Sequence, residues 1–218
     1  MAKLKWKGGA LLAPMPPVMV SCGDMERSNI ITIAWTGIIN TIPPKTYISV
    51  RPSRHSYNMI KEKGEFVINL TPASLIKSAD YCGIYTGAKV DKFAKCGLTK
   101  EEANEVGCPM IAESPLSLEC KVTEIVKIGT HDMFLADIVA VDVDETLLDK
   151  NGKLDLGRAN LAAFAHGEYY ELGKKIGRFG FSAEKEKGKS SKKTQIKIKS
   201  ESNLLSLLVC FGLIICRM

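Results

Sequence analysis

The sequence predicts a mainly β protein, a closed antiparallel barrel with a few short helices packed on its outside. Six or more short strand-like segments are separated by turn residues, and hairpins connect them in place of strand–helix–strand units. In addition, no Gly-x-Gly-x-x-Gly motif follows a predicted strand, which argues against a Rossmann fold. At 218 residues, the chain is long enough for one domain with a sizeable core.

The first two strands form a predicted hairpin. Residues 18–21 read as a strand that ends at the turn signal Gly23-Asp24. In the following strand, large apolar side chains alternate with small or hydroxylated ones. The large ones are Ile31, Ile33 and Trp35, and the small ones are Thr32, Ala34 and Thr36. We expect the small face, together with Asn29, to let a flat group lie close to the backbone. A core position for Trp35 is the competing interpretation.

A basic loop follows the next strand. Pro43-Pro44 turns the chain, and residues 46–51 read as a strand that delivers Arg51 to the start of the loop. The loop carries Arg54, His55 and Ser56, and a helix is predicted to begin at Ser56 or Tyr57. Two arginines, a serine and the unpaired N–H groups of a helix N-terminus favour a phosphate site. A solvated turn is the alternative.

Two helices and a buried strand are predicted next. The first helix, 56–63, stops at Gly64, and the apolar segment 65–70 reads as a strand buried on both faces. The second helix runs from Ser74 to the neighbourhood of Gly83. In the loop that follows, Lys89 is placed to reach the same phosphate as the arginines, although a solvated lysine loop is the alternative.

The C-terminal half is predicted to contain one long hairpin. Before it, Thr99-x-x-Glu102 resembles a capping box and predicts a brief helical turn through Ala103. Residues 117–128 alternate as a half-buried strand does, with Leu118 and Cys120 on the apolar face and Glu119 on the polar one. A bulge is expected near Glu124 or Ile125. Gly129-Thr130 then turns the chain into a second strand that begins at His131.

The charge is concentrated in the C-terminal tail. The chain carries a net charge of +6, and residues 185–218 account for all of it, because residues 1–184 hold 22 basic and 22 acidic side chains. We therefore expect a domain at 1–184 that has no general attraction for nucleic acid. The Lys/Ser-rich and then apolar tail, 185–218, is expected to lie outside the fold. The apolar run 204–216 is short for a bilayer, so membrane or partner association through it stays an alternative.

The seven cysteines show no metal-binding or disulfide pattern. Their number is odd, no Cys-x-x-Cys pair occurs, and the N-terminus lacks the apolar segment of a signal peptide. We expect a cytoplasmic protein with mostly buried free thiols and no metal site. A redox role for one cysteine remains open.

Five motifs in order resemble a known family. They are Asn29-x-x-Thr32-x-Ala34-Trp35, Ser49-Val50-Arg51-Pro52 with Arg54-His55-Ser56-Tyr57, Glu65 to Asn69, Lys89 to Phe93, and Gly129-Thr130-His131. Over roughly residues 10–182, the chain is similar to the flavin reductase-like, FMN-binding split-barrel family, and to its flavoredoxin branch in particular. The resemblance implies an antiparallel split β-barrel of Greek-key type, usually a homodimer with a flavin in each of two interfacial sites.

The resemblance also assigns expected roles. Phosphate contacts are expected from Arg51, Arg54, Ser56 and Lys89, with His55 in the same loop. The ribityl chain and ring are expected along Asn29, Thr32, Ala34 and Trp35, with backbone N–H groups near Ser49 and Val50 facing the polar edge of the ring. His131, at the start of its strand, is expected near the reactive edge of the flavin. It is the one candidate catalytic residue, and a structural role for it is the alternative.

Three functions remain open from the sequence. The first is an FMN-dependent oxidoreductase that takes hydride from NADH or NADPH. The second is a flavoredoxin-type electron carrier whose FMN is reduced by a protein partner. The third is a barrel that has lost its flavin, against which the intact loop at Arg51, Arg54 and Ser56 counts.

Overall fold

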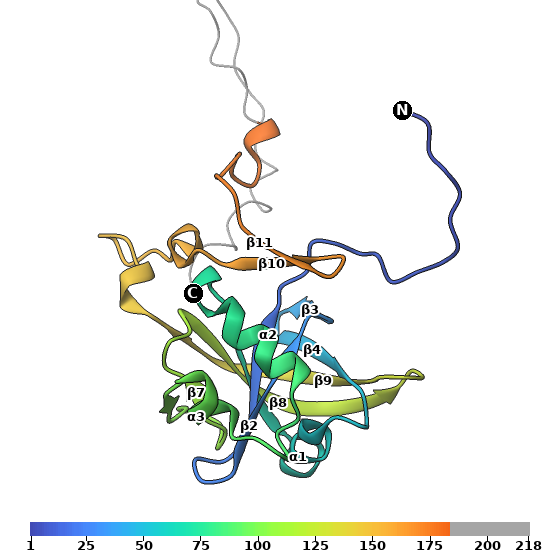
Figure 1. The fold of residues 1–218 in the computed structure, drawn as a ribbon. Helices are drawn as coiled ribbons and strands as arrows, with labels where there is room; N and C mark the ends of the chain where they lie inside the picture. Colours follow the sequence, from blue (N-terminus) through green and yellow to red (C-terminus); the bar gives the residue numbers. More distant parts are fainter. Residues whose placement is uncertain (184–218) are drawn as a thin grey trace, which may run out of the picture. The chain divides into compact units, whose positions relative to one another are not determined.

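One antiparallel sheet of seven strands dominates the structure, a computed structural model that describes residues 1–183 (Figure 1). The strand order is β2-β1-β5-β8-β9-β4-β3. The strands are β1 Val18–Gly23, β2 Ser28–Ile33, β3 Thr36–Thr41, β4 Pro44–Val50, β5 Glu65–Asn69, β8 Leu116–Lys127 and β9 Asp132–Val143. The consecutive strands β4 and β5 flank the β8–β9 hairpin, which is a Greek-key arrangement. The predicted antiparallel, mainly β fold is confirmed.

The sheet curls because its two edge strands are neighbours in the chain. Only Ala34 and Trp35 separate β2 from β3, which stand at opposite ends of the strand order. No ladder joins β2 to β3 within the described strands, so the sheet is open between these two edges, which fits the split barrel that the resemblance implied. The sequence pattern treated residues 29–36 as one strand, whereas the structure breaks that run into two strands at Ala34-Trp35.

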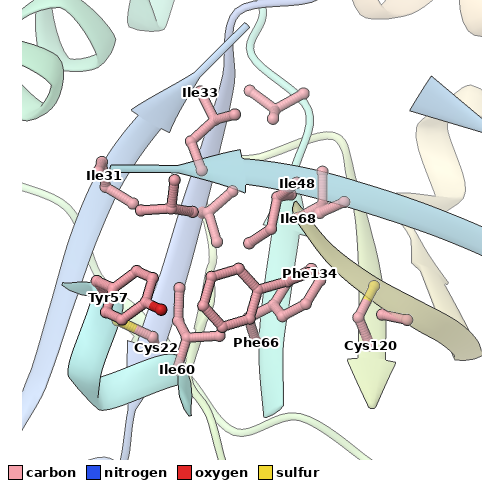
Figure 2. Packing of buried hydrophobic residues seen from close by; sticks show 14 residues of the cluster. Cys22, Ile31, Ile33, Ile48, Tyr57, Ile60, Phe66, Ile68, Cys120 and Phe134 are labelled. Atoms are coloured by element: carbon pink, nitrogen blue, oxygen red, sulfur yellow. The ribbon is translucent and has the colours of Figure 1, made fainter. Parts of the chain in front are cut away.

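The interior of the curled sheet is filled by large apolar side chains (Figure 2). Ile31 and Ile33 of β2 point into it and meet Ile48, Phe66 and Phe134 from the other strands. The apolar face predicted for β2 is therefore confirmed for the two isoleucines. Trp35 is excluded from this core, since 46% of its surface is exposed.

Helix α1 (His55–Lys63) adds Tyr57 and Ile60 to the same core. It ends where the sequence predicted, because Gly64 adopts the left-handed conformation (φ 71°) and its N–H caps the carbonyl of Ile60. Strand β5 is buried along nearly its whole length, as its apolar sequence predicted. The sheet is thus sealed at one end by the helix that follows the basic loop.

Helices α2 (Ile76–Ile84) and α3 (Lys92–Cys96) cover the outer face of β2. Figure 1 shows α2 lying across this strand. A second apolar cluster lies beneath them and includes Ile30 of β2, Cys82 of α2 and Phe93 of α3. A single turn of 3₁₀ helix, η1 (Ala73–Leu75), precedes α2. The helix predicted from Ser74 is therefore present, but its first turn is 3₁₀ and not α-helical.

The predicted helical turn at Thr99–Ala103 is wrong. Lys100–Glu101 (β6) instead pairs with Met110–Ile111 (β7) as a small ladder. The reason is a tertiary contact: the Thr99 N–H donates to both carboxylate oxygens of Glu113, at 3.0 and 3.1 Å. The threonine amide is therefore satisfied without a capping box.

The long hairpin is confirmed as β8 and β9, and one of its two register shifts lies between Val122 and Glu124, beside the predicted bulge. One residue of β8 departs from the alternation of buried apolar and exposed polar side chains. Glu119, expected on the polar face, is fully buried and accepts N–H donors from Asn104, Glu105 and Val106 at 2.6–2.8 Å. The segment 104–106 is thereby fastened to the sheet.

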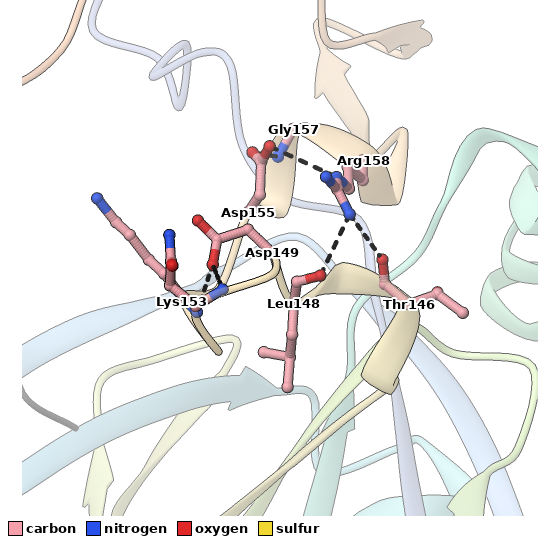
Figure 3. Close-up of polar contacts among 8 residues, drawn as sticks. Thr146, Leu148, Asp149, Lys153, Asp155, Gly157 and Arg158 are labelled. Atoms are coloured by element: carbon pink, nitrogen blue, oxygen red, sulfur yellow. Dashed lines mark hydrogen bonds and ion pairs between the residues drawn. The ribbon is translucent and has the colours of Figure 1, made fainter.

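The connection after β9 is a polar loop (Figure 3). Asp149 accepts the N–H groups of Asn151 and Lys153, which closes a turn. Arg158 donates to the carbonyl oxygens of Thr146 and Leu148. The 3₁₀ turns η2 (Glu145–Leu147) and η3 (Leu156–Ala159) frame it. The hairpin of β10 (Ala162–Ala165) and β11 (Glu168–Glu171) follows.

The chain divides into two units, Met1–Lys175 and Ile176–Met218. Of the second, the structure describes residues 176–183, which include the 3₁₀ turn η4 (Phe181–Ala183). The Lys/Ser-rich segment and the apolar run 204–216 lie outside the described residues, and the domain boundary at 184 stays a prediction. Among residues 1–183, no helix has both the length and the apolar character needed to span a membrane.

Candidate functional site

A pocket of about 200 Å³ opens at the N-terminus of α1, and we call it the Arg51 pocket. It brings together five of the residues predicted from the sequence: Asn29, Arg51, Arg54, His55 and Ser56. The rest of its lining comes from the loop itself, from β2 and from the region of α2 and α3. These residues are Ile31, Ser53, Cys82, Tyr85, Thr86, Gly87 and Lys92.

The loop that bears the arginines is held by its own backbone. The N–H of Arg54 donates to the carbonyl of Arg51 at 2.9 Å, and the N–H of Tyr57 donates to the carbonyl of Arg54 at 3.0 Å. Arg54 has extended backbone angles and is the N-cap of α1, which begins at His55, one residue before the predicted start. The first turn of a nine-residue helix therefore faces the pocket, where N–H groups favour an anion.

The floor of the Arg51 pocket is formed by two buried polar side chains. Asn29 Nδ2 donates to Ser56 Oγ at 2.7 Å, and both residues are almost fully buried. The loop after α2 closes on Asn29 at Gly87, where a Cβ atom would lie 2.1 Å from Asn29 Oδ1. Only glycine allows this approach, so Gly87 is required for the shape of the pocket.

Lys92 is a pocket residue that the sequence analysis missed. It is the first residue of α3, it is buried, and its Nζ donates to the carbonyl oxygens of Ile30 (2.6 Å) and Cys82 (2.8 Å). Burial, and to a lesser degree Arg54, lowers its pKa. Lys89, predicted in this role, is exposed and does not line the pocket. The local signal for it is the N-cap Asp91, which places Lys92 at the start of a helix beside the buried Phe93.

The charge of the Arg51 pocket is uncompensated. Among residues 1–183, neither Arg51 nor Arg54 forms an ion pair, and no acidic side chain contributes to the described lining. Both arginines are exposed, so water solvates their guanidinium groups and they can pair with an anion that enters the pocket. Two guanidinium groups, a lysine, a serine and a helix N-terminus form the donor set that suits a phosphate dianion.

His131 lies beside the mouth of this pocket. Arg51 Nε donates to His131 Nε2 at 3.4 Å, and His131 Nδ1 lies 3.0 Å from Thr130 Oγ1. Burial lowers the pKa of His131, and the charges of Arg51 and Arg54 lower it further. The ring is therefore neutral at pH 7, with its proton on Nδ1, since Nε2 must accept from Arg51.

Trp35 packs against the same histidine. The two ring centroids are 5.6 Å apart at an angle of 45°, and about half of the indole remains exposed. The indole thus presents an open aromatic surface close to the Arg51 pocket. The sequence-based alternative that Trp35 is a core residue does not hold.

Thr32, Ala34 and Trp35 line a second pocket of about 200 Å³, the Trp35 pocket. Its other walls are formed by α2 and by the β10–β11 hairpin, through residues that include Ile84, Phe164 and Tyr169. Asn29 and Thr32 therefore contribute to different pockets, because odd and even residues of β2 face opposite sides of the sheet. The expectation that Asn29 and Thr32 share one face is therefore wrong, because the alternation of a strand places residues 29 and 32 on opposite faces. The Thr32 hydroxyl is already used, since it donates to the carbonyl of Ala79.

Ser49 and Val50 line neither pocket in the described part of the chain. The N–H of Ser49 donates to the carbonyl of Trp35 at 3.0 Å, so this donor already has a protein partner. Val50 is buried in the barrel core, where it pairs with Asp132 of β9. Their structural role is to hold the end of β4 against Trp35 and β9.

The described cysteines are free, and four of the five are buried. Burial raises the pKa of Cys22 to about 11 and the pKa values of Cys82 and Cys108 to about 12. These thiols are therefore protonated at neutral pH and are poor nucleophiles. Within residues 1–183, no cluster of three or more histidine, cysteine or acidic side chains is arranged to hold a metal ion.

Comparisons with known proteins agree with this geometry. The family model described as flavin reductase like domain matches residues 11–173. The fold is similar to that of the flavoredoxin of Desulfovibrio vulgaris (Miyazaki F), with a TM-score of 0.78 and 32% identity over 84% of this chain and 100% of that one. A flavoredoxin from Methanosarcina acetivorans has a TM-score of 0.75 and 28% identity over the same shares. The FMN reductase (NADH) RutF of Enterobacter cloacae is 35% identical over 57% of this chain and 73% of that protein.

Proposed function

Because this chain belongs to the flavin reductase-like domain family, we propose that it is an FMN-binding oxidoreductase that passes electrons through the bound flavin. The observation that carries the proposal is the Arg51 pocket, whose two arginines have no carboxylate partner in the described residues. An uncompensated basic pocket at a helix N-terminus suits the phosphate of a mononucleotide.

In this proposal, the phosphate is held by Arg51, Arg54 and Ser56 at the start of α1. Lys92 supplies the lysine charge from the opposite wall, in the place where the sequence analysis expected Lys89. Asn29 orients Ser56 through their hydrogen bond. The donor set therefore combines two charges at the mouth with buried hydrogen-bonding groups at the floor.

For the ribityl chain and the ring, we propose Asn29 and the stretch from Thr32 to Trp35. Asn29 lines the Arg51 pocket, whereas Thr32, Ala34 and Trp35 line the Trp35 pocket on the other face of β2. The ring would therefore meet this stretch where β2 ends, at the half-exposed indole of Trp35. Neutral His131 fixes the Arg51 side chain on one edge and packs against Trp35 on the other. Bound FMN would supply the redox chemistry, which the side chains of this site do not provide. His131, with no proton to release from Nε2, acts by positioning.

NADH or NADPH is the proposed electron donor, on the strength of the similarity to the FMN reductase (NADH) RutF. A second candidate is an electron carrier whose flavin is reduced by a redox protein. The likeness to the flavoredoxin of Desulfovibrio vulgaris, which this chain covers completely, favours that candidate.

The visible spectrum tests the proposal and separates its two forms. Purified protein reconstituted with FMN is recorded before and after anaerobic NADH or NADPH. Flavin bands that bleach support the reductase, and bands that persist until a protein reductant is added support the carrier. A protein that cannot be loaded with FMN contradicts both.

The phosphate site is tested with Arg51→Gln and Arg54→Gln, against the matched control Arg27→Gln in an exposed turn. Each charge-assisted hydrogen bond contributes roughly 1.5–3 kcal/mol, so each site variant should bind FMN about 10-fold to 100-fold more weakly. The control should bind FMN as the wild type does. Equal affinities for all three variants would remove the Arg51 pocket from the proposal.

We also propose that two copies pair as a homodimer through the β3 edge. Ile38, Ile39 and Ile42 lie on or beside this edge strand with 63%, 48% and 79% of their surfaces exposed. An exposed apolar edge strand is unfavourable in a monomer unless another surface covers it. Light scattering should give a dimer mass for the wild type and a monomer mass for Ile38→Lys, and a monomeric wild type would refute the pairing.

A further inference from the structure

A stacked pair of tyrosines stands at the end of α2, beside the Arg51 pocket. The ring centroids of Tyr81 and Tyr85 lie 4.2 Å apart, and the two ring planes are inclined by 25°. Tyr85 is the C-cap of α2, and its N–H donates to the carbonyl of Tyr81 at 3.1 Å. A backbone hydrogen bond and a ring contact therefore join the same two residues and hold the Tyr85 ring in place.

One side of the Tyr85 ring is open to a ligand. Tyr81 covers one side, while 50% of the Tyr85 surface is exposed. Tyr85 lines the Arg51 pocket together with Thr86 and Gly87, which follow it in the chain. Its hydroxyl forms no hydrogen bond within the described part of the chain. A flat ring that enters the pocket can therefore stack on Tyr85 from the side opposite Tyr81.

The positive groups of the Arg51 pocket lie at two depths. Lys92 is 4% exposed and lies in the interior, whereas Arg51 and Arg54 are exposed and lie at the mouth. The ammonium group of Lys92 has three N–H groups, and it gives two of them to the carbonyl oxygens of Ile30 and Cys82. One N–H group is left for a ligand. Three cations at two depths can hold two linked phosphates, one further inside than the other.

We propose that the Arg51 pocket takes an adenosine diphosphate unit and that Tyr85 is the residue on which its adenine stacks. The two phosphates meet the cations of the interior and of the mouth, and the adenine lies on the open side of Tyr85. Stacking on an aromatic side chain needs no hydrogen bond to the base, which agrees with a tyrosine whose hydroxyl has no partner among the described residues. FAD and NADH both contain this unit, so either dinucleotide could supply it.

The choice of dinucleotide rests on the proposed function, whereas the adenosine diphosphate site does not. The test uses the full chain freed of flavin, titrated calorimetrically with ADP and then, in separate samples, with FMN, FAD and NAD⁺. Tyr85→Leu and Tyr85→Gln remove the ring, and Tyr85→Phe removes only the hydroxyl. Tyr170→Leu is the matched control, because Tyr170 is 51% exposed and lines neither pocket in the described part of the chain. Thermal unfolding shows that each variant is folded.

The ring should decide the affinity for ADP. Wild type, Tyr85→Phe and Tyr170→Leu should bind ADP alike, and Tyr85→Leu and Tyr85→Gln should bind it about 5-fold to 100-fold more weakly. A wild type without affinity for ADP would overturn the proposal, and so would ADP affinities that do not depend on the ring.

The dinucleotides identify the source of the unit. If FAD supplies it, the ratio of FAD affinity to FMN affinity should fall in Tyr85→Leu by the same factor, and if NADH supplies it, the affinity for NAD⁺ should fall. Loss of the ring without effect on either dinucleotide would contradict the proposal. If FMN does not bind while ADP binding depends on Tyr85, the proposed function fails and the adenosine diphosphate site stands.

Discussion

Asn29 and Ser56, 27 residues apart in the chain, are joined by a hydrogen bond of 2.7 Å between the side-chain amide and the hydroxyl. Both side chains are buried. The bond ties β2 to the first turn of α1, so the strand that leads to Trp35 also positions the loop of Arg51 and Arg54. The aromatic and basic halves of the site are therefore fixed by one internal contact.

Gly87→Ala should weaken ligand binding in the Arg51 pocket without unfolding the protein. The new Cβ would lie 2.1 Å from Asn29 Oδ1, so the loop at 85–87 must move away. Gly173→Ala is the matched control, because its Cβ would meet no atom within 4 Å and its backbone does not adopt a positive φ. FMN titration should show a loss of about tenfold for Gly87→Ala and little change for the control.

The double variant Asn29→Ala/Gly87→Ala tests the cause of that loss. Removing the Asn29 amide removes the atoms that the new Cβ would strike. The two losses should therefore be less than additive in the double variant. Fully additive losses would show that Gly87 acts on something other than its approach to Asn29.

Lys92 and Lys89 should behave differently. Lys92→Met removes a buried cation and leaves the carbonyl groups of Ile30 and Cys82 without a donor, so it should cost about 2 kcal/mol in unfolding free energy and at least about tenfold in FMN affinity. Lys89→Met changes an exposed side chain, whose charge is screened by solvent, and should alter both by little. Urea unfolding and FMN titration measure the two effects. A larger affinity loss in Lys89→Met would return the phosphate contact to the residue predicted from sequence.

The local parts of the site were accessible to sequence reasoning, and the tertiary parts were not. Arg51, Arg54 and Ser56 follow one another in a loop between a strand and a helix, so residue type and spacing were enough to group them. Lys92 enters the pocket only because α3 packs on β2. Nothing in the local sequence separates it from Lys89 except the N-cap Asp91.

The fold, like the site, could be predicted from the sequence where the signal is local. The hairpins, α1 with its terminal Gly64 and the apolar face of β2 follow local patterns, and the structure confirms them. The capping box at Thr99 failed because Glu113, fourteen residues away, supplies the partner. Glu119 was assigned to solvent by alternation, but the segment 104–106 folds over it. Both errors arise where a distant carboxylate satisfies backbone N–H groups.

Glu119 should be essential for stability, and its neighbour Asp142 should not be. Burial works against the charge of Glu119, but the N–H groups of Asn104, Glu105 and Val106 prevail and lower its pKa. Glu119→Gln would turn an N–H₂ group towards these donors and should cost about 2–3 kcal/mol in unfolding free energy. Burial and the facing Glu119 raise the pKa of Asp142, so Asp142→Asn, which resembles the protonated acid, should be neutral or stabilising at pH 8. Thermal and urea unfolding of both variants decide this, and equal destabilisation would contradict it.

His131 should titrate below its ordinary pKa of 6.5, because burial and then Arg51 and Arg54 disfavour its protonated form. The unfolded chain then binds this proton more readily than the folded protein. The stability that neutral His131 provides is therefore complete above pH 6.5 and is lost as the pH falls through the folded pKa. Protonation would also remove the acceptor for Arg51 Nε and place two cations side by side. An NMR titration of the His131 ring should show a midpoint below 6.5 that rises in Arg51→Gln and not in Arg27→Gln. A midpoint at or above 6.5 in the wild type would mean that the guanidinium does not donate to this ring, and His131 would then regain its candidacy as a proton donor.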